Sequence, residues 1–180
     1  MKRAVFLDRD GVVNEAPVRD GKPFPPKDVA SLHIPAGTAE ALDRLKQQGY
    51  LLLVVTNQPD VPRGKVTRGA VEAINQHLRA NLPLDDVFTC YHDDADNCDC
   101  RKPKPGLLLQ AARQYGIDLP SSYMIGDRWR DTDAGANAGC KTILIDMGYQ
   151  DQEPASAPSF QAKSLPEAVD WILNNDAENV

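Results

Sequence analysis

The sequence predicts an α/β fold built on a doubly wound parallel sheet, with helices packed on both faces. Short apolar runs alternate along the chain with amphipathic stretches, which is typical of a parallel sheet covered by helices. The chain has 180 residues and 42% apolar content, a size that suits one buried core. We therefore expect a three-layer, Rossmann-like single domain over residues 1–180.

Each expected strand is an apolar run too short for a globular helix. The first run precedes Asp8, the second has five consecutive apolar residues, and the last has the sequence Lys-Thr-Ile-Leu-Ile. Together the five runs cover residues 3–7, 51–55, 86–91, 122–125 and 141–145. In open α/β sheets, ligands gather beyond the carboxyl ends of the strands, so we expect the chemistry directly after these runs.

The expected helices fill the gaps between these runs. Apolar residues line one face of the first helix before Gly49, a plausible stop, and Thr67 is a candidate N-cap for the second. The five helices cover residues 36–48, 67–79, 105–115, 130–138 and 166–171. Residues 16–30 and 149–162 contain prolines and lack periodicity, so we expect surface loops there.

The charge balance argues against two classes of partner. With 26 acidic and 20 basic residues, the formal charge of −6 provides no electrostatic footprint for nucleic acid or an anionic membrane. The apolar N-terminal run stops at Asp8, too early for a signal peptide, and no run approaches the roughly 20 apolar residues that span a bilayer. We expect a cytoplasmic protein that binds neither nucleic acid nor membrane, and a monomer in preference to an oligomer.

Two carboxylates, Asp8 and Asp10, follow the first strand, and Gly11 permits a turn there. A carboxylate can attack phosphorus, while a second one protonates the leaving oxygen and later takes a proton from water. Asp8 suits the first role and Asp10 the second. The alternative is an acidic turn or helix cap without chemistry.

Polar and basic groups follow two other apolar runs. Thr56 and Asn57 end the second strand, where a hydroxyl and backbone N–H groups can hold phosphoryl oxygens; a plain N-cap or turn is the alternative. Three cations in residues 101–104 precede a helix that Pro105 can start, and Lys102 is our candidate for a phosphoryl clamp. The alternative for this segment is a solvated basic turn.

Another carboxylate, Asp127, follows the fourth strand. Magnesium prefers one or two carboxylates plus phosphate and water oxygens, which Asp8, the backbone carbonyl of Asp10 and Asp127 could supply together. The alternative is that the carboxylates here cap the next helix, which is the role Asp131 suits.

These four positions, in chain order, resemble the haloacid dehalogenase superfamily of phosphatases. The pattern is D-x-D-G, an apolar strand ending in Thr, a Lys before a helix, and G-D-x-x-x-D, and it spans residues 4–146. The resemblance implies magnesium-dependent hydrolysis through an aspartyl-phosphate, with Asp8 as nucleophile, Asp10 as acid and base, and Thr56 and Lys102 holding the phosphoryl group.

Residues 6–14, 55–58 and 98–103 resemble the subgroup of heptose bisphosphate and histidinol phosphate phosphatases. The resemblance implies a small capless enzyme that removes the 7-phosphate of a heptose 1,7-bisphosphate. Histidinol phosphate or another small phosphate is the alternative substrate, and a phospholigand-binding domain without turnover is a more distant one. Arg101 and Arg128 would then contact substrate phosphates.

The chain departs from the subgroup pattern beside the expected substrate. Arg63-Gly64-Lys65 supports the heptose assignment and makes Arg63 a candidate substrate contact, with Asn57 beside it. Pro59-Asp60-Val61-Pro62 stands where the subgroup often has Ser-Gly-Ile-Ala, so the loop is stiffer and more acidic. Arg128 stands where the subgroup often has Lys and offers a planar fork in place of a point charge.

Three cysteines and one histidine form a complete set of tetrahedral zinc ligands. Cys90, His92, Cys98 and Cys100 lie within eleven residues, and soft thiolates favour zinc over magnesium. With all four positions filled by protein, the metal is expected to be structural. Disulfides are the alternative. The subgroup resemblance implies the same zinc-binding loop, although the gap between His92 and Cys98 is short here.

Overall fold

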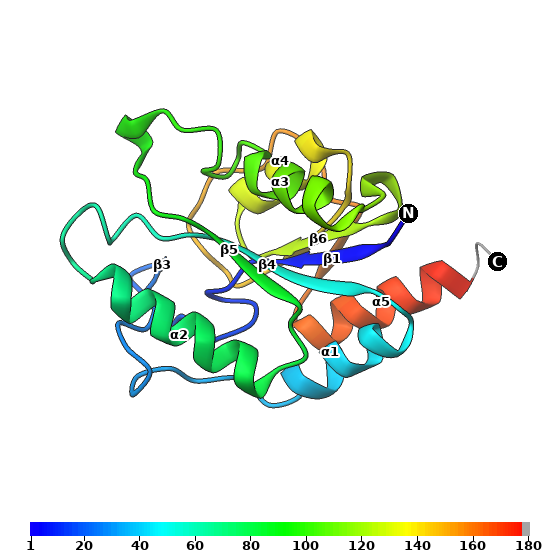
Figure 1. Cartoon of the computed structure of the whole chain (residues 1–180), viewed down its shortest axis with the longest axis horizontal. Coiled ribbons are helices and arrows are strands. Elements are labelled where there is room, and N and C mark those ends of the chain that lie inside the picture. Colours follow the sequence, from blue (N-terminus) through cyan, green and yellow to red (C-terminus); the bar gives the residue numbers. More distant parts are fainter. Residues whose placement is uncertain (178–180) are drawn as a thin grey trace.

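Six parallel strands form the central sheet of the protein, for which a computed structural model describes residues 1–177 (Figure 1). Their order across the sheet is β5-β4-β1-β6-β7-β8, and every neighbouring pair is parallel. They are β1 (Ala4–Leu7), β4 (Leu51–Asn57), β5 (Asp86–Cys90), β6 (Tyr123–Gly126), β7 (Lys141–Ile145) and β8 (Phe160–Ala162). From β1 the chain adds β4 and then β5 on one side of it, and it adds β6, β7 and β8 on the other side. The switch point of the sheet therefore lies between β1 and β6.

Helices cover both faces of this sheet, which confirms the predicted doubly wound α/β class. In Figure 1, α3 (Gly106–Tyr115) and α4 (Trp129–Ala138) lie above the strands. Below them lie the helices α1 (Thr38–Gln47), α2 (Arg68–Asn81) and α5 (Leu165–Ala177).

The first strand shows why the sheet is apolar on both faces. Val5 and Leu7 of β1 pack in the core beneath α1, α2 and α5, whereas Ala4 and Phe6 pack in the core beneath α3 and α4. Successive strand residues point to opposite faces, and here both faces are covered. A fully buried parallel strand is therefore a continuous apolar run.

Two segments expected to be loops contain strands, so those expectations were wrong in part. Residues 16–30 include an antiparallel hairpin of β2 (Val18–Arg19) and β3 (Lys22–Pro23), with Gly21 at a positive φ of 71°. Residues 149–162 include β8, which pairs with β7 at the sheet edge. Both strands are too short to show a periodic pattern, and pairing with a neighbour forms them.

The last helix, α5, extends six residues beyond the expected end at Trp171. Its final turns carry Asp176, which accepts hydrogen bonds from Arg3 at 2.7 Å, Tyr123 at 3.1 Å and Tyr50. These distant partners stabilise turns that the sequence pattern alone does not support. Among the described residues, the helices include none with both the length and the apolar character needed to cross a membrane.

Candidate active site

A polar cavity of about 580 Å³ opens at the carboxyl ends of β1, β4 and β6. It lies at the switch point of the sheet, where ligands of open α/β folds bind. Residues of the β2–β3 hairpin border it together with a group of charged side chains: Asp8, Asp10, Lys102, Asp127, Arg128 and Asp131. A second cavity, of about 610 Å³ and mostly apolar lining, lies behind the Asp8 turn. The polar cavity contains the groups that phosphoryl transfer requires.

Lys102 lies at the centre of this cavity wall and is almost completely buried. Its ammonium donates to Asp8 Oδ1 at 2.8 Å, to Asp131 Oδ1 at 2.6 Å and to the backbone carbonyl of Val55 at 2.8 Å. Burial opposes its charge, but the Asp131 and Asp8 carboxylates outweigh burial and hold the pKa of Lys102 above its ordinary value. The three acceptors fix a positive charge beside Asp8.

Three carboxylates gather beside this lysine, and they are suited to a divalent cation. Oxygens of Asp8, Asp127 and Asp131 all lie within 4.8 Å of one another. Burial and repulsion from Asp131 raise the pKa of Asp8 to about 6, and burial together with Asp8 raises the pKa of Asp127. Asp127 Oδ1 is buried without a hydrogen-bond partner among the described residues. A hard cation bound here would satisfy that oxygen and offset the repulsion.

Gly11 explains how the Asp8 turn comes so close to Asp127. Its φ is 89°, and a Cβ on this residue would lie 2.0 Å from Asp127 Oδ2. Any side chain here would both strain the backbone and displace the carboxylate. The expected turn after the first strand is therefore present, and it requires glycine for two reasons.

Asp10 faces the same cavity and is held by three side chains that we did not predict as site residues. Oδ1 accepts from Arg9 Nη2 and from Asn14 Nδ2, each at 3.0 Å, and Oδ2 accepts from Gln58 Nε2 at 2.9 Å. Arg9 is fully buried and also donates to Asn75 at 3.1 Å. These donors fix the orientation of both Asp10 oxygens. The position of Arg9 between Asp8 and Asp10 is the one sequence feature that could have indicated such a partner for Asp10.

The two residues that end β4 lie in different settings, and of the two only Asn57 lines the cavity. Thr56 is fully buried, and its hydroxyl accepts from Gln58 Nε2 at 3.0 Å. The side-chain amide of Asn57 makes two hydrogen bonds to the Lys102 backbone. Its Nδ2 donates to the Lys102 carbonyl at 3.1 Å, and its Oδ1 accepts from the Lys102 N–H at 3.1 Å. Asn57 therefore holds the Lys102 segment in place, and its expected contact with substrate stays a prediction.

Tyr149 is a further site residue that sequence patterns did not reveal. Its hydroxyl donates to Asp127 Oδ2 at 2.6 Å from a loop 22 residues further along the chain. We expect Tyr149→Phe to weaken magnesium binding by about five- to tenfold, because Asp127 loses the donor that orients it. Calorimetric titration of magnesium into the metal-free protein measures this. The control is Tyr91→Phe, outside this cavity, and equal magnesium affinity in both variants would contradict the prediction.

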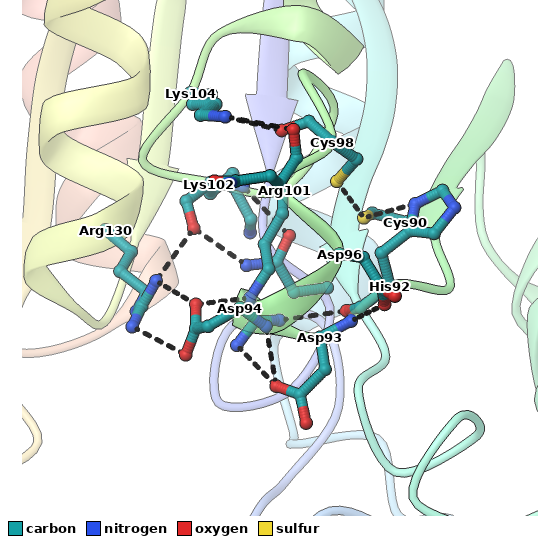
Figure 2. A network of polar contacts seen from close by, with 12 residues as sticks. Cys90, His92, Asp93, Asp94, Asp96, Cys98, Arg101, Lys102, Lys104 and Arg130 are labelled. Atoms are coloured by element: carbon teal, nitrogen blue, oxygen red, sulfur yellow. Dashed lines mark hydrogen bonds and ion pairs between the residues drawn. The ribbon is translucent and has the colours of Figure 1, made fainter.

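The arginines predicted to bind substrate lie at the cavity rim, and each is paired with an acidic side chain. Arg63 pairs with Asp93, and Arg128 pairs with Asp151 at 2.8 Å. Arg101 Nε donates to Asp94 Oδ1 at 2.8 Å (Figure 2). The predicted residues are therefore brought to one cavity, and further partners hold their guanidinium groups.

The proposed zinc ligands meet at one point beside β5. Sulfur–sulfur distances are 3.7 Å for Cys90–Cys98, 3.0 Å for Cys90–Cys100 and 3.4 Å for Cys98–Cys100, and His92 Nδ1 lies 3.3 Å from Cys100 Sγ. Ligands about 2.3 Å from a tetrahedral zinc ion lie about 3.8 Å apart, so the cluster is close to that size. All four cysteines, including Cys140, are free thiols. The residues fit zinc and not a disulfide pairing.

Replacing one thiol tests this site. We expect Cys98→Ser to release the zinc and lower the melting temperature by several degrees, because binding to a structural zinc site contributes to folding free energy. Metal content and thermal unfolding of the purified protein measure both effects. The matched control is Cys140→Ser, which changes a thiol outside the cluster and should keep one equivalent of zinc. A Cys98→Ser protein that also keeps one equivalent would show that the cluster is not the zinc site.

The chain is similar to known phosphatases in sequence. A model of the HAD-hydrolase-like family matches residues 99–170. A D-glycero-beta-D-manno-heptose-1,7-bisphosphate 7-phosphatase of Helicobacter pylori is 38% identical over 178 residues, which is 94% of this chain and 97% of that protein. The protein of the same name from Salmonella typhi is 34% identical and covers 97% of this chain, with 92% of its own length matched.

Solved structures agree with these sequence relatives. The structure of D,D-heptose 1,7-bisphosphate phosphatase from B. bronchiseptica complexed with magnesium and phosphate has a TM-score of 0.78 and 30% identity, with 97% of this chain and 99% of that chain covered. A HAD-like phosphatase structure from Mesorhizobium loti has a TM-score of 0.76 and 27% identity, with coverages of 98% and 87%.

Proposed function

Because the chain belongs to the haloacid dehalogenase-like family of phosphatases, we propose that it removes the 7-phosphate from D-glycero-β-D-manno-heptose 1,7-bisphosphate. The chain matches relatives bearing that name along almost their whole length, which supports the substrate class. The observation that carries the chemistry is the buried Lys102 ammonium between Asp8 and Asp131, beside an Asp127 oxygen that has no hydrogen-bond partner within residues 1–177. The proposed metals are magnesium in the cavity and zinc in the loop.

In the proposed reaction, Asp8 attacks the phosphorus of the 7-phosphate, and the bond from phosphorus to the sugar oxygen breaks. Asp10 donates a proton to that oxygen, and the product is heptose 1-phosphate. Asp10 then takes a proton from water as it attacks the aspartyl-phosphate, which releases inorganic phosphate and restores Asp8. Lys102 and the Thr56 hydroxyl hold the phosphoryl oxygens, and Lys102 offsets the negative charge.

Magnesium, when bound by Asp8, Asp127 and the Asp10 carbonyl, supplies Lewis-acid stabilisation of the phosphoryl charge. The chain's own residues prepare the site for that charge. The three side chains that donate to Asp10 keep its carboxyl directed at the cavity, and the Asn57 amide keeps the Lys102 backbone beside β4. The orientation of Asp10 and Lys102 therefore depends on residues with no role in bond making.

The test is phosphate release from both heptose 1,7-bisphosphate anomers, histidinol phosphate and a panel of sugar monophosphates, with magnesium and then with a chelator. We expect magnesium-dependent turnover with a clear preference for the β anomer. Preference for histidinol phosphate would leave the phosphatase assignment in place and overturn the heptose assignment. No turnover of any compound would favour a phospholigand-binding domain.

We further propose that the protein acts in the cytoplasm as a monomer. The absence of a disulfide among the four cysteines, three of them proposed zinc ligands, supports a reducing compartment, because thiols oxidise or pair in a secretory one. Cell fractionation tests the location, and size-exclusion chromatography with light scattering tests the oligomeric state. Recovery in the periplasmic fraction, or a mass of two chains, would overturn the corresponding part.

A further inference from the structure

Four arginines line the cavity, and one short segment supplies carboxylates that pair with three of them, Arg63, Arg101 and Arg130 (Figure 2). Arg63 donates to both oxygens of Asp93, at 2.5 and 2.7 Å. Arg101 donates to Asp94 Oδ1 at 2.8 Å, and Arg130 donates to the same oxygen at 3.2 Å. Figure 2 shows Asp94 between Arg101 and Arg130. The three arginines come from three segments of the chain, so these two carboxylates join them.

The carboxylates that pair with these arginines do not line the cavity in the part of the chain that the structure describes. All three arginines line it, whereas within residues 1–177 neither Asp93 nor Asp94 is part of its wall. The Asp94 side chain is 60% exposed, but that of Arg101 is only 11% exposed. The arginines therefore line the cavity, while carboxylates that do not line it hold their guanidinium groups.

The segment that carries these carboxylates lies inside the zinc loop. The short 3₁₀ helix η1 (Asp94–Asp96) falls between the proposed ligands His92 and Cys98. The Asp93 N–H donates to Asp96 Oδ2 at 2.7 Å, which closes the turn. A turn tied at both ends to a metal cluster is a rigid support for the arginines.

Three guanidinium groups around one cavity form an anion site, and Lys102 already serves the reacting phosphate. Arginine side chains lose rotamer freedom when they are fixed, and holding them before binding removes that penalty from substrate affinity. The two carboxylates also cancel part of the positive charge, which opposes anion binding. Asp60 lies 3.7 Å from Arg63 as well, so what the group offers an anion is a set of fixed hydrogen-bond donors and not a large net charge.

We propose that Asp93 and Asp94 are positioning residues that determine the preference for a bisphosphate. They hold Arg63, Arg101 and Arg130 as the site for the phosphate that stays on the product. This inference rests on the proposed function and deepens it: the arginines bind the second phosphate, and the zinc loop keeps them in place. A monophosphate leaves this site unused.

The experiment compares Asp94→Asn with wild type on heptose 1,7-bisphosphate and on heptose 7-phosphate and p-nitrophenyl phosphate, each of which lacks the second phosphate. We expect KM for the bisphosphate to rise about tenfold with kcat within twofold, and kcat/KM for both monophosphates to stay within twofold. The Kd of the product heptose 1-phosphate, measured by calorimetry, should rise by the same factor. Asp93→Asn should shift the same quantities through Arg63.

The matched control is Asp99→Asn, which removes one exposed carboxylate from the same loop outside the arginine contacts. It should leave kcat, KM and the product Kd within twofold of the wild-type values, and every variant should keep one equivalent of zinc. Equal losses on all three substrates would overturn the inference, because they would indicate an effect on the reacting phosphate or the fold. Tighter product binding would also overturn it, since the carboxylate would then be a competitor. A wild type inactive on the bisphosphate would overturn the proposed function itself.

Discussion

Asp8→Asn is expected to lower turnover by about 10⁴-fold or more while the fold stays intact. An amide of the same shape cannot serve as the nucleophile that forms the aspartyl-phosphate, and 10⁴-fold corresponds to about 5.5 kcal/mol of barrier. Phosphate release with magnesium measures the loss, and circular dichroism checks the fold. Asp99→Asn, the same change on an exposed side chain, should keep wild-type turnover. Activity within 100-fold of wild type would refute the role of Asp8.

The same variant is expected to be more stable than wild type when magnesium is removed. Burial and repulsion from Asp131 outweigh the opposing effect of Lys102 and raise the pKa of Asp8 from 3.8 to about 6. A raised carboxyl pKa favours the folded state at low pH, and that contribution is lost as pH rises through about 6. Above this pH the folded wild type carries an unfavourable charge that asparagine lacks, an effect of up to about 3 kcal/mol. Thermal unfolding in chelator should show a difference that grows between pH 5 and pH 7, and a constant difference would contradict this cause.

Lys102→Met is expected to lower both turnover and stability. Methionine fills similar space but leaves the buried carboxylates of Asp8 and Asp131 and the Val55 carbonyl without their donor. Removing one partner of a buried ion pair costs about 3–5 kcal/mol, which corresponds to about 10 °C in melting temperature for a chain of this size. We expect kcat to fall by about 10³-fold, because the charge beside the phosphoryl group is lost.

Two controls apply to Lys102→Met: the pH dependence of its stability, and the matching substitution of the neighbouring Lys104. The pKa of Lys102 is raised by Asp131 and Asp8 against the effect of burial, so its stabilisation is fully present below pH 10 and cannot cause a pH effect between 5 and 8. The deficit of Lys102→Met should therefore shrink toward pH 5 only through protonation of the carboxylates. Lys104→Met, an exposed lysine of the same loop, should keep turnover and melt within about 2 °C of wild type. A Lys102→Met protein as stable as wild type at pH 8 would contradict the ion-pair account.

The parts of the fold that could be predicted are those with a local signal. Five strands are apolar runs because both faces of the sheet are covered, and the helices between them carry one apolar face. Strand β8 and the β2–β3 hairpin were missed because two or three residues cannot show a period. The end of α5 was misplaced because its last turns are stabilised by partners at the other end of the chain.

The candidate site divides in the same way. Asp8, Asp10 and Asp127 stand directly after strands, where the carboxyl ends of a parallel sheet meet, and the structure brings them into one cavity. Arg9 and Tyr149 were missed as partners, since a charge inside a motif or a tyrosine in a loop does not specify what it contacts. Asp131 was expected as a helix cap, and it accepts both the Arg128 N–H, at 3.1 Å, and the Lys102 ammonium.

By itself, the sequence determined the layered fold, the order of the reactive groups along it and the set of candidate zinc ligands. Those features depend on hydrophobic periodicity and on the spacing of residues within short stretches, so the sequence shows them without any knowledge of distant contacts. Only the tertiary structure decided which charges are paired: Asp94 with Arg101 and Arg130, and Asp93 with Arg63. Ion pairs form between groups within a few ångströms, and here the fold brings together residues that are up to 36 positions apart.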